Sequence, residues 1–204
     1  MEDVLEVYHR PYDPARPQVC LDESSKQLLE HTRVPIAASR GRTARVDDEY
    51  KRCGTANIFA AIEPLSGVSI VEVTERRTAV DMAHFLRRIA EQYSHAAVIV
   101  LVMDNLNIHA LSCLYEAFEP AEARRLAERF EVHHTPKHGS WLNVAEILLS
   151  ILSRECLDQR IGSMAELRST IAAWQRSRSR TPVKWRFTTA DARIKLHRLY
   201  PSIP

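Results

Sequence analysis

Three acidic residues occupy positions at which carboxylates could bind a metal ion or take part in catalysis. Asp22 and Asp104 each end an apolar run typical of a strand, over Gln18–Asp22 and Ala97–Met103. In open α/β sheets, ligands gather at the carboxyl ends of strands, so we expect the two aspartates to converge there. Glu146 interrupts a helical pattern that is otherwise apolar, and a carboxylate that faces a core unpaired is strongly disfavoured. We therefore expect a cation to meet it.

The ion that suits these residues is a hard divalent metal. Carboxylate oxygens select Mg²⁺ or Mn²⁺, and the sequence offers neither a Cys-x-x-Cys pair nor clustered imidazoles. Three carboxylates can hold two such ions, which at ~3.5–4 Å apart clamp the attacking and leaving oxygens of a phosphoryl displacement. The chemistry indicated is phosphodiester hydrolysis or transfer.

Each acid also has an ordinary structural explanation. An aspartate at a strand end is often a turn former, and a helical glutamate is usually solvated. Composition does not decide between these interpretations, because the net charge of +2, from 28 basic and 26 acidic residues, is too balanced to indicate a polyanionic partner. The chain has only 5 glycines and lacks a glycine-rich phosphate loop, which disfavours a nucleotide cofactor. The four scattered cysteines are expected to be reduced, buried thiols.

The elements that must position the acids follow an α/β pattern. Strands at Ala56–Ile62 and Val68–Thr74 flank a turn and predict an antiparallel hairpin. Thr78 and Asp81 then form a capping box before a helix with one apolar face. Further elements are expected as helices at Pro120–Phe130, at Leu142–Leu157, after Ser163 and at Thr188–Leu199, with a short strand around Val132. Alternating strands and helices predict one α/β domain.

The ends and loops complete this organisation. Prolines punctuate residues 1–17, which we interpret as a connection from a missing segment, ahead of one folded domain over residues 18–204. Pro35–Asp48 is expected to be an exposed basic loop. The longest apolar stretch, Ala96–Met103, is far shorter than the ~20 residues of a membrane-spanning helix. A cytoplasmic protein without a membrane partner is therefore predicted.

Three sequence blocks carry a family resemblance. They are VCLDE at residues 19–23, LVMDNLNIH at 101–109 and TPKHGSWLNVAE at 135–146. Together they resemble the DDE superfamily endonucleases of bacterial insertion sequences, in the mariner-related transposase group. Supporting stretches, GTANIF at 54–59, RRTA at 76–79 and FTTADAR at 187–193, extend the resemblance over nearly the whole chain.

The resemblance implies a fold and a metal site. Asp22, Asp104 and Glu146 match the three metal-binding acids of the family. The implied fold is ribonuclease H-like, a mixed central sheet flanked by helices, with the two aspartates on neighbouring strands and the third acid on a helix. The implied cofactor is Mg²⁺ or Mn²⁺, as two ions.

The resemblance also implies a reaction. Water cuts DNA at the ends of the mobile element, and the freed 3′ hydroxyl then attacks target DNA, typically at a TA dinucleotide. The implied partners are transposon ends, target DNA and a second copy of the chain, in the nucleoid of a bacterial cytoplasm. Family members usually carry an N-terminal helix-turn-helix region that binds the inverted repeats, and this sequence begins after it. The resemblance therefore implies that residues 1–17 are a linker from a missing N-terminal DNA-binding region and that residues 18–204 are the DDE catalytic domain.

Other residues are candidates for supporting roles. His109, Lys137, His138, Arg40, Arg42 and Arg45 are candidates for DNA contact, although His109 could instead organise its loop through a hydrogen bond. Glu23 should point away from the metal side, because strand side chains alternate. Trp141 is expected to pack in the core, and Asn105 and Asn107 are expected to be turn residues.

Two other functions stay open at this point. The chain could be a ribonuclease H-like nuclease that cuts strands without joining them. It could also be a truncated or inactive transposase remnant that acts only as a DNA-binding or dimerisation module.

Overall fold

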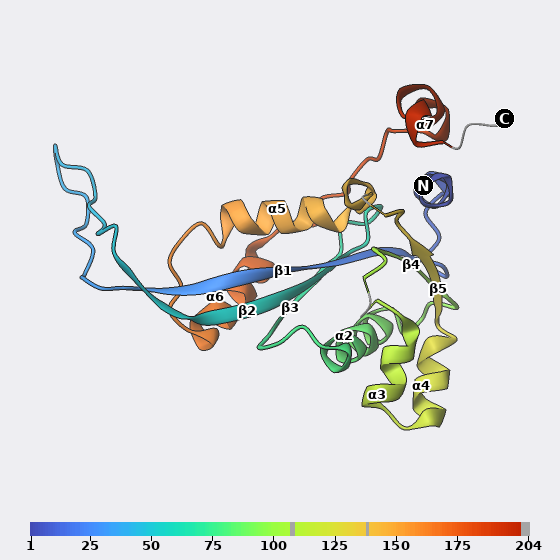
Figure 1. Ribbon diagram of the computed structural model, residues 1–204, viewed down its shortest axis with the longest axis horizontal. Coiled ribbons are helices and arrows are strands. Elements are labelled where there is room, and N and C mark those ends of the chain that lie inside the picture. The colour runs from blue at the N-terminus through green and yellow to red at the C-terminus, as the bar shows by residue number, and fades with distance from the viewer. Residues whose placement is uncertain (107–108, 138, 201–204) are drawn as a thin grey trace.

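The computed structural model describes residues 1–106, 109–137 and 139–200, which fold around a five-stranded mixed sheet (Figure 1). The strand order is β3-β2-β1-β4-β5. Strand β1 pairs antiparallel with β2 and parallel with β4, while β2–β3 is antiparallel and β4–β5 parallel. The strands are β1 (Gln18–His31), β2 (Tyr50–Ile62), β3 (Ser69–Thr74), β4 (Ile99–Met103) and β5 (Phe130–His134). The predicted mixed central sheet is confirmed.

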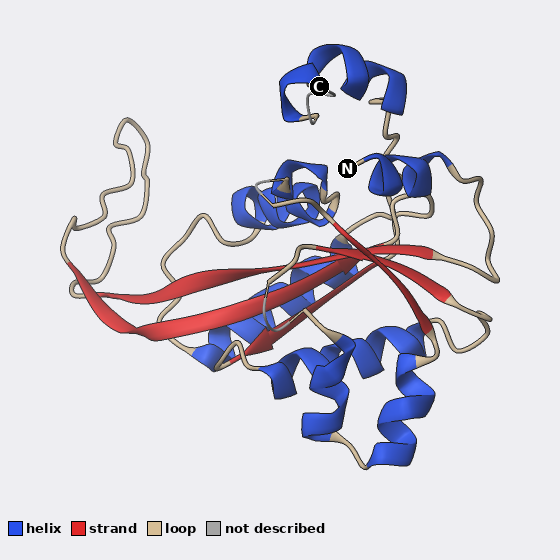
Figure 2. Ribbon diagram, turned by 45° about the vertical axis from the view of Figure 1, so that its right-hand side comes forward, coloured by secondary structure: helices blue, strands red, loops and turns tan. Residues whose placement is uncertain are grey.

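Helices cover both faces of the sheet (Figure 2). Alternation along each strand divides the buried side chains between two cores. One core packs α2 (Ala79–Gln92), α3 (Leu114–Ala117) and α4 (Pro120–Ala127) against the face that carries Leu21 and Leu101. The other core lies on the face that carries Cys20 and Val102 and packs α1 (Glu2–His9), α5 (Ala145–Glu155), α6 (Met164–Ser177) and α7 (Thr189–Lys195). Single turns of 3₁₀ helix lie at Leu111–Cys113, Ser140–Leu142 and His197–Leu199.

Local sequence signals are confirmed where they are strong. Thr78 and Asp81 form the expected capping box of α2, and Ser163 caps α6. All five residues of β4 are buried, as expected for a central strand. The β2–β3 hairpin closes through the Glu63 N–H, which donates to the Val68 carbonyl at 2.8 Å. All four cysteines are free.

The first strand differs from its prediction. It does not end at Asp22 but continues to His31, because β2 pairs with it as far as Tyr50. Strand β4, in contrast, pairs with β1 only as far as Cys20. Residues beyond Asp22 are largely polar, so they lack the apolar pattern from which a strand is predicted. Asp22 therefore lies within a strand and not at its end.

The N-terminal segment is also different from the linker predicted over residues 1–17. Residues Glu2–His9 form α1, in which Val4, Leu5 and Val7 are fully buried. Eight residues are too short a window to show a helical period clearly, so the prolines at 11, 14 and 17 dominated the prediction. Whatever precedes it, α1 is part of the folded core.

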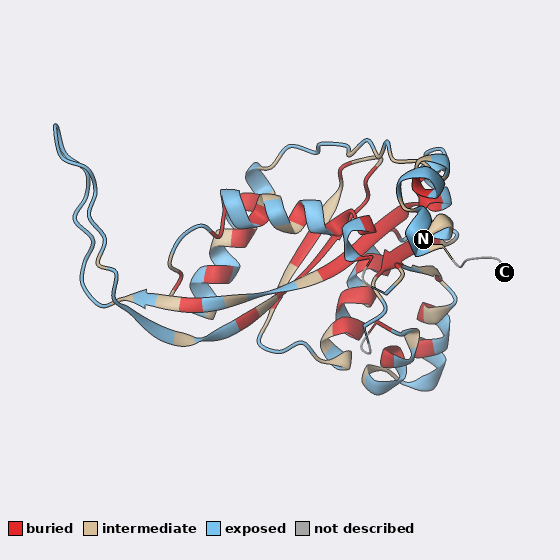
Figure 3. Ribbon diagram, turned by 45° about the horizontal axis from the view of Figure 1, so that its top comes forward, coloured by how far each residue is buried: buried red, intermediate tan, exposed pale blue. Residues whose placement is uncertain are grey.

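Residues 32–49 form an exposed arm between β1 and β2, which Figure 3 shows projecting away from the buried body of the molecule. Two isolated bridges, Ile36 with Arg45 and Ser39 with Arg42, hold it as an irregular hairpin. Gly41, with φ of 77°, turns its tip. The exposed basic loop predicted here is confirmed. Among the helices that the structure describes, none is long and apolar enough to cross a membrane.

Candidate active site

The parallel pairing of β1 with β4 brings Asp22 and Asp104 to the same level of the sheet. The last pair in this ladder joins Cys20 to Val102. Asp22 lies two residues after Cys20, and Asp104 lies two residues after Val102. Asp22 is 7% exposed within the continuing strand β1. Asp104 is the first residue after β4, and its side chain is 34% exposed. Of the two aspartates expected on neighbouring strands, Asp22 lies in β1, and Asp104 directly follows the neighbouring strand β4.

Glu146 is the second residue of α5 and lies in its first turn. Its side chain is exposed, while Ala145, Leu148 and Leu152 form the buried face of the helix. The prediction that Glu146 faces a core is therefore wrong: the buried face of α5 runs through Ala145, Leu148 and Leu152, and Glu146 lies about 100° around the helix from Ala145. An exposed carboxylate is solvated by water, so the position of Glu146 does not by itself require a cation.

Asn143 connects the start of α5 to Asp22. Its buried amide Nδ2 donates to the Leu21 carbonyl at 2.7 Å and to Asp22 Oδ2 at 3.2 Å. Its Oδ1 accepts from the Ala145 N–H at 3.1 Å. Sequence reasoning did not single out this residue, although an asparagine just before a helix is a recognised signal for a capping role. Through these bonds, the acid of β1 and the helix that carries Glu146 are held together.

The charges of the neighbouring acids affect the pKa of Asp22. Burial raises the pKa of the Asp22 carboxyl to about 7, opposed by the Glu23 backbone N–H, and the charges of Glu146, Glu23 and Asp104 add to the rise. A cation would remove this repulsion, and three carboxylates without a thiolate suit a hard divalent ion. Within the described residues, no three His, Cys, Asp or Glu side chains converge tightly enough to hold an ion. The charges of Glu146 and Asp104 thus reach Asp22, but the described residues do not form a closed ion site.

His109 lies beneath this group and not on its surface. The side chain is 0% exposed, with Nδ1 hydrogen-bonded to the Asp104 carboxylate and Nε2 2.8 Å from Glu23 Oε2. Burial lowers the pKa of His109, but the contacts with Glu23 and Asp104 prevail and raise it above its ordinary value. The expectation of DNA contact is wrong for this residue, because a fully buried ring cannot reach a phosphate. The alternative, a hydrogen bond that organises the loop, is confirmed.

Comparison with protein families assigns this chain to a superfamily. Residues 17–168 match the family described as DDE superfamily endonuclease. The chain belongs to this superfamily. Among curated proteins, none matches the chain significantly.

Solved structures show the same fold as this DDE endonuclease chain. The Mos1 strand transfer complex superposes with a TM-score of 0.58 at 14% identity, covering 86% of this chain and 51% of that chain. The Mos1 transposase paired-end complex with left transposon end gives 0.58 at 17% identity, covering 88% and 54%. The Mos1 mariner paired end complex with Mn gives 0.56 at 16% identity, covering 87% and 53%. The predicted ribonuclease H-like α/β fold is confirmed, and the chain spans about half the length of these chains.

Lys137 is an exposed candidate DNA contact in the DDE chain that lies in a cleft beside Asp104. It lines a cleft of about 310 Å³ together with Asp104, Asn105 and Ser140. Its side chain is exposed, so its ammonium group is free to meet a phosphate. His138, the next candidate, lies outside the described residues, as does Asn107.

The remaining candidates lie elsewhere. Arg40, Arg42 and Arg45 are exposed on the arm, at the opposite end of the sheet from β4 and β5 (Figure 1). Trp141, predicted to pack in the core, is 46% exposed and meets Phe187 edge-on at 5.7 Å between ring centroids. That prediction is wrong, because Trp141 belongs to a separate 3₁₀ turn and not to the buried face of α5.

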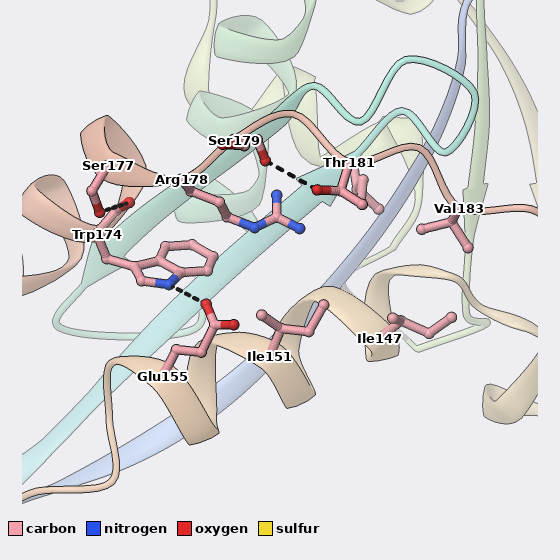
Figure 4. Close-up of a pocket in the computed structure, with 10 residues that line it drawn as sticks. Ile147, Ile151, Glu155, Trp174, Ser177, Arg178, Ser179, Thr181 and Val183 are labelled. Carbon is pink, nitrogen blue, oxygen red and sulfur yellow. Dashed lines mark hydrogen bonds between the residues drawn. The ribbon is translucent and has the colours of Figure 1, made fainter.

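A second hollow, between α5 and α6, is not part of the DDE site (Figure 4). Its volume is about 430 Å³, and Ile147, Ile151 and Val183 give it apolar walls. The one acid in its lining, Glu155, accepts a hydrogen bond from Trp174 Nε1 at 2.9 Å. A single paired carboxylate in an apolar lining offers no ligand set for a divalent ion.

Proposed function

We propose that this chain is the catalytic domain of a DNA transposase, which cuts DNA and joins the freed 3′ end to a target with divalent metal ions held by Asp22, Asp104 and Glu146. The observation that carries the proposal is the juxtaposition of the three acids: Asp22 in β1 lies level with Asp104, which directly follows the adjacent parallel strand β4, and the charge of Glu146 adds to the rise in the pKa of Asp22 that burial causes. Membership of an endonuclease superfamily supports DNA as the substrate.

Each residue has a distinct part in this mechanism. Two Mg²⁺ or Mn²⁺ ions, when bound, would activate water and stabilise the attacking and leaving oxygens at phosphorus. Asp22, Asp104 and Glu146 would hold them, and Asn143 orients Asp22 through its amide. Lys137, in the cleft beside Asp104, is placed to bind a phosphate of the DNA strand. The exposed cations of the arm would bind DNA further from the cut.

The proposed partners are transposon ends, target DNA with a TA dinucleotide and a second copy of the chain. Mos1, which shares the fold, is described in a paired-end complex with left transposon end and in a strand transfer complex. By analogy of fold we propose a paired assembly with DNA for this chain, and from the resemblance to bacterial insertion sequences we propose that it acts in the nucleoid of a bacterial cytoplasm. Under this proposal, residues 18–204 together with α1 form the catalytic domain.

A strand-transfer assay tests the proposal. Labelled DNA carrying an exposed 3′ hydroxyl at a transposon end is incubated with target DNA and Mn²⁺. We expect joined products from the unmodified protein and none from Asp22→Asn, Asp104→Asn or Glu146→Gln, since each removes a metal ligand without removing packing. Glu122→Gln is the matched control, because Glu122 lies in the first turn of α4 as Glu146 does in α5.

The same assay separates the alternatives. Cleaved strands without joined products would identify a nuclease. DNA binding without cleavage at any Mn²⁺ concentration would identify an inactive binding or dimerisation module. Retained joining in any one of the three acid variants would contradict the role of that acid.

A further inference from the structure

Asp104 needs a support that its strand does not supply. It lies just beyond β4, where the ladder with β5 ends at Met103 and His134. A carboxylate on such a loop loses rotamer freedom when it binds an ion, which weakens binding unless neighbouring groups already hold it. Its Oδ1 accepts a hydrogen bond from the Leu106 N–H at 3.1 Å and is bonded by His109 Nδ1.

His109 joins Asp104 to the body of the sheet through Glu23. The ring is fully buried, and its Nε2 lies 2.8 Å from Glu23 Oε2. Neither atom has an aligned hydrogen-bond partner elsewhere in the part of the chain that the structure describes, so each depends on this electrostatic contact. The carboxylate of Glu23 is itself 4% exposed, and Arg77 Nη1 donates to its other oxygen at 3.0 Å.

The place of Glu23 in β1 makes this connection effective. Glu23 follows Asp22 directly, and because strand side chains alternate, it lies on the opposite face of the sheet from Asp22. It cannot join the three acids as a ligand, but its backbone is fixed to that of Asp22. The contacts of His109 with Glu23 and with Asp104 therefore fix the position of the Asp104 side chain relative to Asp22.

We propose that the Glu23–His109 pair positions the Asp104 carboxylate for metal binding, so that His109 and Glu23 are positioning residues of the DDE site. The proposal rests on the metal-binding role proposed above. Among the described residues both recorded contacts of the Asp104 carboxylate fall on Oδ1, which leaves Oδ2 to meet an ion. Partners of this kind, one step behind a metal ligand, typically alter metal affinity by about 10–100-fold when they are removed.

The test measures Mn²⁺ binding by calorimetry on the full chain without DNA. We expect His109→Ala to raise the Kd for Mn²⁺ by about 10–100-fold, and Glu23→Gln to raise it in the same direction. His133→Ala is the matched control, because His133 is also a largely buried histidine between two carboxylates, Asp3 and Glu131, neither of which is one of the three acids. Its Kd should equal that of the unmodified protein.

A conservative variant separates positioning from general damage to the fold. In His109→Asn the side-chain amide can take the place of Nδ1 beside Asp104, so it should recover part of the Mn²⁺ affinity lost in His109→Ala. A merely structural role predicts no such recovery at equal melting temperature. If His109→Ala unfolds, His109→Asn and Glu23→Gln carry the test.

The outcomes distinguish this inference from the proposed function. If the unmodified protein binds Mn²⁺ and Asp104→Asn loses binding while His109→Ala and Glu23→Gln keep it, the positioning role is overturned and the metal site stands. If the unmodified protein itself binds no Mn²⁺, the proposed function fails at its first step and the positioning role fails with it.

Discussion

The three acids of the site have unequal surroundings. Asp22 is buried in a strand, Asp104 is partly exposed on a loop and Glu146 is exposed in the first turn of a helix. Burial is the main cause of the raised pKa of Asp22, and the charges of Glu146, Glu23 and Asp104 add to it. Asp22 should consequently determine how the metal-free site responds to pH.

We expect the metal-free protein to lose stability as the pH rises towards neutrality. The pKa of Asp22 rises from 3.8 to about 7 on folding, so the folded state keeps a proton that the unfolded chain has released. This contribution is present below the unfolded pKa and is lost as the pH rises through the folded one. Between about pH 5 and about pH 8 the loss should be on the order of 2 kcal/mol.

Urea unfolding in the presence of a chelator measures this effect. In Asp22→Asn the side chain cannot ionise, so the part of the pH dependence that comes from Asp22 should vanish, while the part that comes from His109 stays in both proteins. An equal pH dependence of the unmodified protein and of Asp22→Asn would show that Asp22 is ordinarily ionised in the fold.

Asn143 offers a second test at the level of single side chains. Asn143→Ala leaves the buried Leu21 carbonyl without its amide donor, which should lower the free energy of unfolding by about 1–3 kcal/mol. Strand cleavage should fall as well, since Asp22 loses a hydrogen bond that orients it. Asn105→Ala is the control, because Asn105 is exposed beside Asp104. Equal stability of the two variants would contradict the connecting role of Asn143.

Helix α1 is far from α5 in the sequence, but it contacts the segment that leads into α5. Tyr8 Oη donates to the Leu142 carbonyl at 2.7 Å, directly before the Asn143 turn. Tyr8 also packs against Trp185 at 5.0 Å between ring centroids. Arg193 on α7 forms a bidentate pair with Glu2 on α1, at 2.7 Å for each bond. Helix α1 thus links the C-terminal segment to the turn that leads into α5.

Removing a core side chain from α1 should destabilise the whole domain. Leu5→Ala opens a cavity at a fully buried position and should cost about 2–5 kcal/mol of unfolding free energy. Val34→Ala, at a position that is 90% exposed, should change it by no more than about 0.5 kcal/mol. Thermal or urea unfolding checks both. Equal small effects would mean that residues 1–9 belong to the detachable linker predicted over residues 1–17.

In the molecule as a whole, the site and the arm occupy opposite ends of the sheet (Figure 1). Strands β1 and β2 extend well beyond the body of the protein and carry residues 32–49 at their tip (Figure 3). Arg40, Arg42 and Arg45 are exposed there. This geometry suits contact with DNA at a distance from the cut.

The salt dependence of DNA binding tests this arrangement. Replacement of Arg40, Arg42 and Arg45 by alanine should reduce the slope of log affinity against log salt by about 2–3, since each lost phosphate contact removes about 0.9. Arg124 and Arg125, exposed on α4, give a control double variant. An unchanged slope in the arm variant would show that the arm does not touch DNA.

The sequence by itself determined those features that are encoded locally. Strand β4 is a continuous apolar run, and α2 carries both its cap and its apolar face within fourteen residues. The three blocks around Asp22, Asp104 and Glu146 were sufficient to indicate the superfamily that the family match confirms.

Only the tertiary structure decided which groups are buried and which strands continue. β1 extends past Asp22 because β2 pairs with it, His109 is buried in contact with Glu23 and Asp104, and Glu146 is exposed because it lies off the buried face of α5. Burial and pairing depend on segments that are far apart in the chain, whereas caps and periodicity depend on neighbours. A local pattern could therefore indicate the acids and the strands and helix that carry them. The burial and contacts of each side chain depend on the packing of segments that are distant in the sequence.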